Sequence, residues 1–150
     1  MGGAQPGLAD RLRKLFSGRP HWMNGLMLFC IFMTFIYLPW DIFIKPVEVD
    51  QEVWFGIMFT GWAAKIAAIP HWGVYAAGAY GFWKMAGWMW PWAAAYAAQI
   101  AIGMAVWALL HPWSEDGALV ALVALGSFIP FAALSWALWN SRSLFGSRNE

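Results

Sequence analysis

Charged side chains are scarce in this sequence. Of its 150 residues, nine are Lys or Arg and eight are Asp or Glu, which makes 11% of the chain charged, whereas soluble domains carry about 25%. Because no basic patch stands out, we expect no nucleic-acid partner. The apolar content is 61%, with thirteen tryptophans, and this excludes a disordered chain.

Cysteine is nearly absent as well. Cys30 is the only one in the sequence, so an internal disulfide, and with it a disulfide-stapled scaffold, is excluded. Because Cys30 lies within an apolar run, we interpret it as a small buried apolar residue.

Long stretches without Asp, Glu, Lys or Arg dominate the sequence instead. About 20 apolar residues suffice to cross a hydrocarbon core of roughly 30 Å, and several stretches reach or approach that length. We therefore predict an all-α, multi-pass integral membrane protein, a four-helix bundle rich in Trp. The charge-free stretches are 20–40, 66–83, 85–114 and 117–141. The predicted transmembrane helices cover about 22–44, 63–84, 92–110 and 118–139.

The segment before the second span, residues 51–69, allows more than one structure. A single straight helix over 51–84 would be about 51 Å long, which exceeds the hydrocarbon core. Asp50 suits an N-cap, with Glu52 in the first helical turn, and Pro70 is a natural site for a bend. We predict an interfacial helix that starts near Gln51, with a re-entrant segment as the alternative.

The basic residues indicate the orientation. With four spans, both ends of the chain share one side of the membrane, and seven of the nine basic residues flank that side. Since such residues stay in the cytoplasm, we predict a four-span domain at 21–140 between a cytoplasmic amphipathic tail at 1–20 and a cytoplasmic tail at 141–150. The Ala-, Gly- and Trp-rich composition favours a bacterial cytoplasmic membrane. The seven residues are Arg11, Arg13, Lys14, Arg19, Lys84, Arg142 and Arg148.

Small residues recur every four positions in two of the predicted helices. Such stripes allow helix backbones to approach closely. We predict that the second and third spans pack against each other in antiparallel contact, with a homo-oligomer interface as the alternative. The stripes are Gly73, Ala77 and Gly81 in the second span, and Ala93, Ala97, Ala101 and Ala105 in the third.

Three ionisable residues are candidates for a ligand or ion site. Lys65 separates two apolar runs, and ionisable residues at membrane depth are costly and often functional. Asp41, at the outer end of the first span, is its predicted partner, and His71 lies further along the second span. For Lys65 we favour a structural role, either an ion pair or snorkelling to the headgroups, with the ligand or ion site as the alternative.

The sequence has no pattern typical of catalysis or of a metal site. His21, His71 and His111 fall at different predicted depths, and no two of them have the helical spacing of a metal site. There is no pair of carboxylates within a span, no Gly-rich phosphate loop and no hydrolase cluster. We therefore expect no metal, no cofactor and no catalytic residue, and favour a protein that is not an enzyme.

These observations lead to a ranked set of functions. The first is a non-enzymatic accessory subunit of a membrane complex or a binder of an apolar ligand. Its expected partners are the lipid bilayer, other membrane subunits or a second copy of itself, and an apolar small molecule. The second is an oligomeric small transporter or channel with Asp41, Lys65 and His71 near its path. The third is an integral membrane enzyme that acts on a lipid-like substrate.

Overall fold

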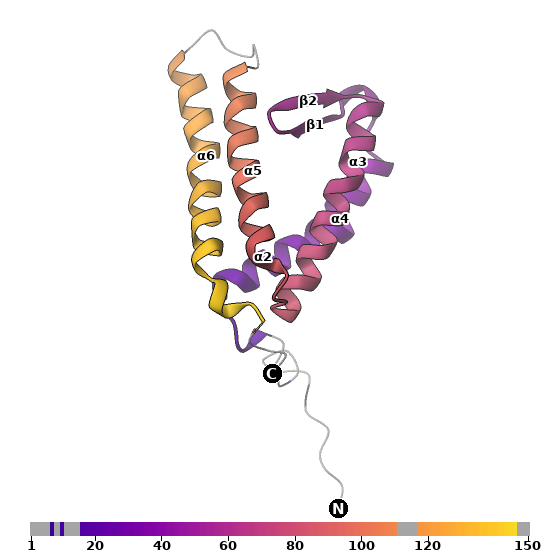
Figure 1. Cartoon of the computed structure of the whole chain (residues 1–150). Coiled ribbons are helices and arrows are strands. Elements are labelled where there is room, and N and C mark those ends of the chain that lie inside the picture. Colours follow the sequence, from indigo (N-terminus) through magenta and orange to yellow (C-terminus); the bar gives the residue numbers. More distant parts are fainter. Residues whose placement is uncertain (1–6, 8–9, 11–15, 111–116, 147–150) are drawn as a thin grey trace, which may run out of the picture.

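Two helical arms diverge from one end of the molecule (Figure 1). The computed structural model describes residues 7, 10, 16–110 and 117–146 of the chain. Most of the predicted tail 1–20, the last four residues of the predicted tail 141–150, and His111 therefore lie outside the described residues. The first arm contains α2 (His21–Phe32), η1 (Met33–Tyr37), α3 (Leu38–Phe43) and α4 (Trp62–Lys84); the second contains α5 (Met89–Leu110) and α6 (Gly117–Asn140).

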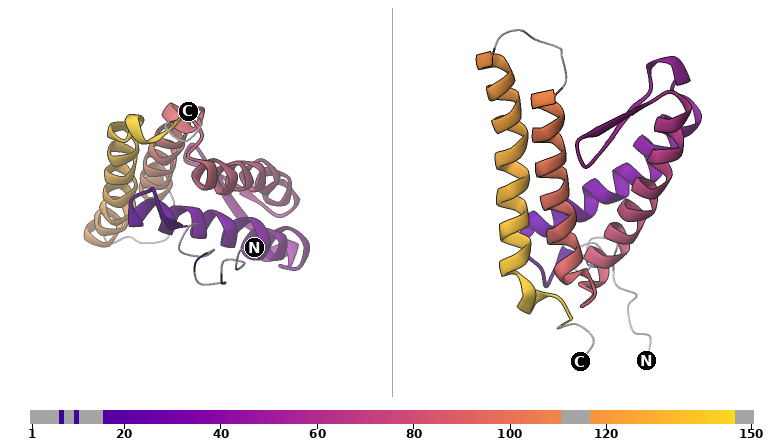
Figure 2. Two further views of the ribbon diagram at one scale, coloured as in Figure 1. Left: turned by 90° about the horizontal axis from the view of Figure 1, so that it is seen from below. Right: turned by 45° about the horizontal axis from the view of Figure 1, so that its top comes forward.

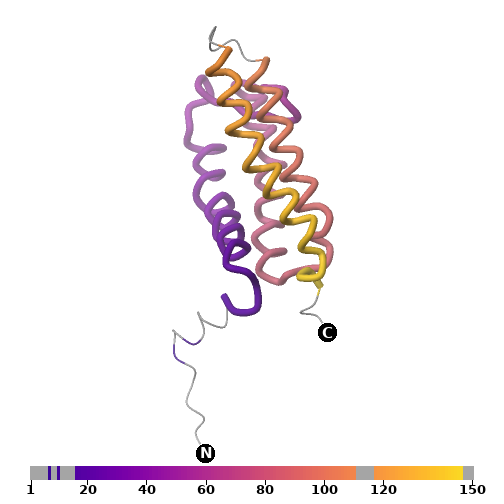
Figure 3. The backbone as a smooth tube through the Cα atoms, turned by 90° about the vertical axis from the view of Figure 1, so that its left-hand side faces the viewer, coloured from indigo at the N-terminus to yellow at the C-terminus, as the bar shows by residue number. Residues whose placement is uncertain are grey.

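The helices run between the same two ends of the molecule (Figure 3). At one end, which we call the basic end, lie Arg19, Lys84 and Arg142. At the other, the hairpin end, two short strands lie between the arms (Figure 2). The short helices η2 (Val47–Val49) and η3 (Arg142–Leu144) complete the described elements.

Three helical segments of the described chain are long and apolar enough to cross a membrane. They are His21–Phe43, which joins α2, η1 and α3, Met89–Leu110 and Gly117–Asn140. This confirms a helical protein of membrane-spanning composition. Helix α4 has 23 residues but includes Lys65 and His71, which lower its apolar character.

The first of these segments contains a wider helical turn, η1, which is a π-helix. Pro39 follows this turn and has no N–H to donate to the carbonyl of Thr34, five residues earlier. The indole Nε1 of Trp72 on α4 donates to that carbonyl instead, at 2.8 Å. The wider turn thereby binds the first segment to α4.

Residues 51–60 form a β-hairpin, so the predicted interfacial or re-entrant helix is wrong. Strands β1 (Gln51–Trp54) and β2 (Ile57–Thr60) pair antiparallel. The two turn residues, Phe55 and Gly56, both have positive φ, 51° and 83°, as in a type I′ turn. Strand-forming Val, Trp, Ile, Phe and Thr prevail on both sides of this turn, and the acidic residues that suggested a helix start have partners elsewhere in the fold.

The second arm is held together along its length, whereas the two arms meet mainly at the basic end. Helix α5 packs along α6, where the Ser135 hydroxyl donates to the Ala94 carbonyl at 2.8 Å. Helices α4 and α5 come close where Met89 packs on Gly81. A core at this end contains Met23, Met27, Phe82, Met85, Met89 and Leu138.

The packing of the small-residue stripes therefore differs from the prediction that the second and third spans pack against each other. Ala97 and Ala101 are buried in α5, but the helix packed along α5 is α6. Gly73 on α4 faces open space. A small residue permits close approach, but it does not specify which helix approaches, and here the hairpin occupies part of the space between the arms.

Candidate functional site

Two adjoining cavities lie between the arms. The first, the apolar cavity, has a volume of about 510 Å³. The second, the polar chamber, has a volume of about 360 Å³ and lies toward the hairpin end. Tyr75, Tyr96, Gln99 and Ile100 line both of them, so the two cavities share a wall.

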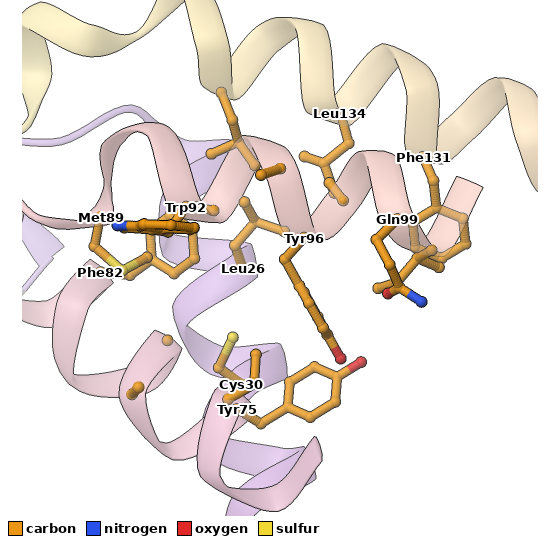
Figure 4. Close-up of a pocket in the computed structure, with 18 of the residues that line it drawn as sticks. Leu26, Cys30, Tyr75, Phe82, Met89, Trp92, Tyr96, Gln99, Phe131 and Leu134 are labelled. Carbon is orange, nitrogen blue, oxygen red and sulfur yellow. The ribbon is translucent and has the colours of Figure 1, made fainter. Parts of the chain in front are cut away.

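The apolar cavity is lined by all the long helices and by the tip of the hairpin. Figure 4 shows its side chains, with Leu26 and Cys30 from α2, Tyr96 from α5 and Leu134 from α6. Trp92, which also lines it, is 70% exposed. The cavity is therefore open on the side of Trp92 rather than sealed within the protein.

Small side chains leave room for this cavity. Ala77 and Gly78 face it from α4, and Ala93 and Ala97 face it from α5. At Gly78 an added Cβ would meet the sulfur of Cys30, which also lines the cavity, at 3.0 Å, so α4 and α2 lie close together there. Ala77, Ala93 and Ala97, which the sequence analysis assigned to helix packing, thus line the apolar cavity as well.

Between the two cavities, strand β1 contacts α4 through two side chains on one face of the strand, Glu52 in the polar chamber and Trp54 in the apolar cavity. Oε1 of Glu52 lies 2.7 Å from Nδ1 of His71. The Trp54 ring stacks on the His71 ring, with 3.8 Å between centroids and 12° between planes. Nε1 of Trp54 donates to the Ala67 carbonyl at 3.0 Å. Because alternate strand residues share a face, both side chains reach α4 together.

Tyrosines and one amide complete the chamber. The Tyr96 ring lies edge-on to His71 and to Tyr75, at 6.0 Å in each case, and the two tyrosine hydroxyls point toward one another (Figure 4). Oε1 of Gln99 is buried without a hydrogen-bond partner among the described residues. Since buried polar atoms are normally paired, this oxygen is an acceptor available to a ligand.

A buried ion network lies beside the chamber at the base of the hairpin. Nζ of Lys45 lies 2.9 Å from the Asp41 carboxylate and 2.6 Å from that of Asp50. Nζ of Lys65 lies 3.1 Å from Asp50 and donates to the main-chain carbonyls of Asp41 and Lys45. The network joins the end of α3, the start of β1 and the first turn of α4.

The charges in this network stabilise one another. Burial by itself raises the pKa of Asp50, but the neighbouring ammonium groups of Lys45 and Lys65 hold that pKa below its usual value. Burial lowers the pKa of Lys45, and its contacts with Asp50 and Asp41 more than offset this and raise it. Asp50 and Lys45 therefore remain ionised at neutral pH.

The structure separates the three predicted site residues into two groups. Asp41 and His71 line the polar chamber. Lys65 is 5% exposed, so it does not snorkel, and its ion-pair partner is Asp50 rather than the Asp41 carboxylate. The chain turns into the hairpin directly after Asp50, which brings this residue against α4.

Sequence analysis does not find most of the chamber. Glu52 is interpreted there as part of a helix. The spacing between Tyr75 on α4 and the pair Tyr96 and Gln99 on α5 carries no signal, because the two groups belong to different helices. Among the residues that the structure describes, no three His, Cys, Asp or Glu side chains gather as a metal site requires. His21 lies at the basic end, away from the chamber.

Comparison of the chain with protein-family models, with curated proteins and with solved structures yields no match. The argument for its function therefore depends on the geometry of the two cavities.

Proposed function

We propose that this protein binds an amphipathic, lipid-like molecule within the membrane. The chain of the ligand lies in the apolar cavity and its polar end lies in the polar chamber. The observation that carries the proposal is the wall shared by the two cavities, at Tyr75, Tyr96, Gln99 and Ile100. Each volume lies within the range of about 300–1,000 Å³ that is typical of small-molecule sites.

The order of the two cavities along α4 supports this proposal. His71 of the chamber is nine residues from the start of α4 and Phe82 of the apolar cavity is twenty, which places them about 14 Å and about 30 Å along the helix. Polar groups thus lie nearer the hairpin end and apolar groups nearer the basic end. A lipid-like molecule with its polar end at the hairpin end matches this order.

The proposal includes an arrangement in the membrane. We propose that α4 is a fourth span beside the three apolar segments and that the basic end faces the cytoplasm of a bacterium. Lys84 and Arg142 at that end support this orientation, and the tryptophans near them, Trp83 and Trp90, suit the headgroup level.

The test compares two substitutions one residue apart on α4. Both Ala76 and Ala77 are exposed, but Ala77 lines the apolar cavity and Ala76 lines neither cavity. The protein is purified gently and native mass spectrometry detects any retained small molecule. We expect the parent and Ala76→Phe to carry a lipid-like molecule in stoichiometric amount, and Ala77→Phe to lose it because the phenyl ring fills the cavity.

The same spectra discriminate the other candidate functions. A foreign protein subunit in stoichiometric amount, with no small molecule, favours an accessory subunit. A homo-oligomer without a small molecule favours a transporter or channel. Equal retention by Ala77→Phe and Ala76→Phe places the molecule outside the cavity and contradicts the proposed site.

A further inference from the structure

We infer that the polar end of this ligand is an ammonium group, so that the site takes cationic amphiphiles. This inference rests on the proposed function and assigns the chemical class of its ligand. It depends on the charges, the rings and the unpaired acceptor that face the polar chamber.

The charge of the lining excludes an anionic headgroup. Asp41 and Glu52 face the polar chamber, and no Lys or Arg is among the described residues that line either cavity. A carboxylate or phosphate placed there would meet two acidic groups in a site with little water. Because like charges repel strongly under such conditions, fatty acids and phospholipid phosphates are poor occupants.

The ion network leaves one carboxylate of the polar chamber, Glu52, without an ammonium partner. The ammonium groups of Lys45 and Lys65 lie against Asp41 and Asp50, which balances these four charges. Glu52 has only His71 as a partner, and its side chain is 17% exposed. A partly buried carboxylate is stabilised by a nearby positive charge, and a cationic ligand in the chamber supplies one.

The remaining lining suits a cation too. Tyr37, Tyr75 and Tyr96 line the chamber, and the rings of tyrosines attract ammonium groups. The unpaired Oε1 of Gln99 adds a further partial negative charge. A neutral hydroxyl can satisfy Gln99 but brings no positive charge to Glu52.

The test uses three probes with the same sixteen-carbon chain, in nanodiscs that contain the full-length protein. They are hexadecyltrimethylammonium, 1-hexadecanol and hexadecanoate. Specific binding is the saturable binding of each probe in excess of its binding to nanodiscs without protein. We expect the ammonium probe to bind at least tenfold more tightly than the alcohol, and hexadecanoate to show no saturable binding. The trimethylammonium group has no N–H, so its preference reports charge and not hydrogen bonding.

Two substitutions test whether Glu52 causes the preference for the ammonium probe over the alcohol. We expect Glu52→Gln to weaken binding of the ammonium probe at least tenfold while binding of 1-hexadecanol stays within about twofold. Glu48→Gln is the matched control, because Glu48 is exposed and forms no ion pair with a described residue. If Glu52→Gln displaces the hairpin and removes all binding, the ranking of the three probes on the parent protein decides.

The outcomes separate this inference from the proposed function. Saturable binding of 1-hexadecanol that equals or exceeds that of the ammonium probe overturns the inference and leaves the proposed function standing. Tight ammonium binding that Glu52→Gln leaves unchanged, with alcohol binding intact, also overturns it. If no probe binds saturably to the parent, the proposed function itself fails.

Discussion

Lys65 joins three segments that are distant in the chain. Its ammonium lies 3.1 Å from the Asp50 carboxylate and donates hydrogen bonds to the main-chain carbonyls of Asp41 and Lys45. The side chain is almost completely buried. The hairpin, α3 and the start of α4 are therefore held in place by one cation, and removing it leaves Asp50 with only Lys45.

The first prediction concerns this pair. Lys65→Met should lower the free energy of unfolding by about 3–5 kcal/mol, because breaking a buried ion pair leaves an uncompensated charge. Adding Asp50→Asn should recover much of that loss. Denaturant or thermal unfolding in detergent measures the coupling energy through a double-mutant cycle.

Two controls sharpen that cycle. Lys84→Met, on the exposed cation at the end of α4, should change stability little. The cycle of Lys65 with Asp41 should give weaker coupling than the cycle with Asp50, because Lys65 meets Asp41 through the main chain. Coupling to Asp50 near zero would contradict the network as described.

The second prediction is a pH dependence that follows from Asp50. Its pKa is lowered in the folded protein, so this contribution to stability is fully present above the unfolded-state value of about 3.9 and is lost as the pH falls through the folded-state pKa. We expect the parent protein to lose stability more steeply below about pH 4 than Asp50→Asn does. Thermal unfolding measured from pH 7 to pH 3 compares the two, and parallel curves would contradict the prediction.

At the scale of the elements, the hairpin spans the gap between the arms. Its strand β1 is fixed to α4 by Glu52 and Trp54, and its tip rests on α5. A Cβ at Gly103 would lie 3.3 Å from the main-chain nitrogen of Gly56, so the two backbones touch there. The Gly56 backbone also packs against the side chain of Val106 on α5. The hairpin thereby contacts both arms, and its strand β1 forms one wall of the polar chamber.

The third prediction separates the hairpin tip from α5. Gly103→Leu should push the tip away, because the new side chain occupies the space of the Gly56 backbone. We expect faster hydrogen exchange at the amides of residues 51–60 and weaker ligand binding. Gly73→Leu is the matched control, since its added side chain meets open space on α4. Equal exchange in Gly103→Leu and Gly73→Leu would show that the contact does not hold the hairpin.

At the scale of the whole molecule, the open prediction is the orientation in the membrane. Reporters fused after Lys84 and after Arg142 should both be cytoplasmic, because basic residues gather at that end. A reporter fused after Leu110 should be external. An external signal at Lys84 combined with a cytoplasmic one at Leu110 would invert the arrangement, and a cytoplasmic signal at all three positions would contradict four spans.

What the sequence by itself determines is the set of membrane-length helices. In a bilayer each backbone polar group must be paired, and a helix pairs its own groups within one segment. The length and apolar content of a segment therefore suffice to locate such a helix. The charge-free stretches at 20–40, 85–114 and 117–141 coincide with the three apolar helical segments of the structure.

Only the tertiary structure decides the site. The hairpin at 51–60 forms where local signals favour a helix start, because Asp50 and Glu52 find Lys65 and His71 on α4 rather than backbone N–H groups. The polar chamber then assembles from side chains of η1, α3, β1, α4 and α5, and the spacing between these elements in the sequence carries no signal. It exists because the arms diverge from the basic end, and the angle between two helices depends on all their contacts together rather than on the pattern within either one.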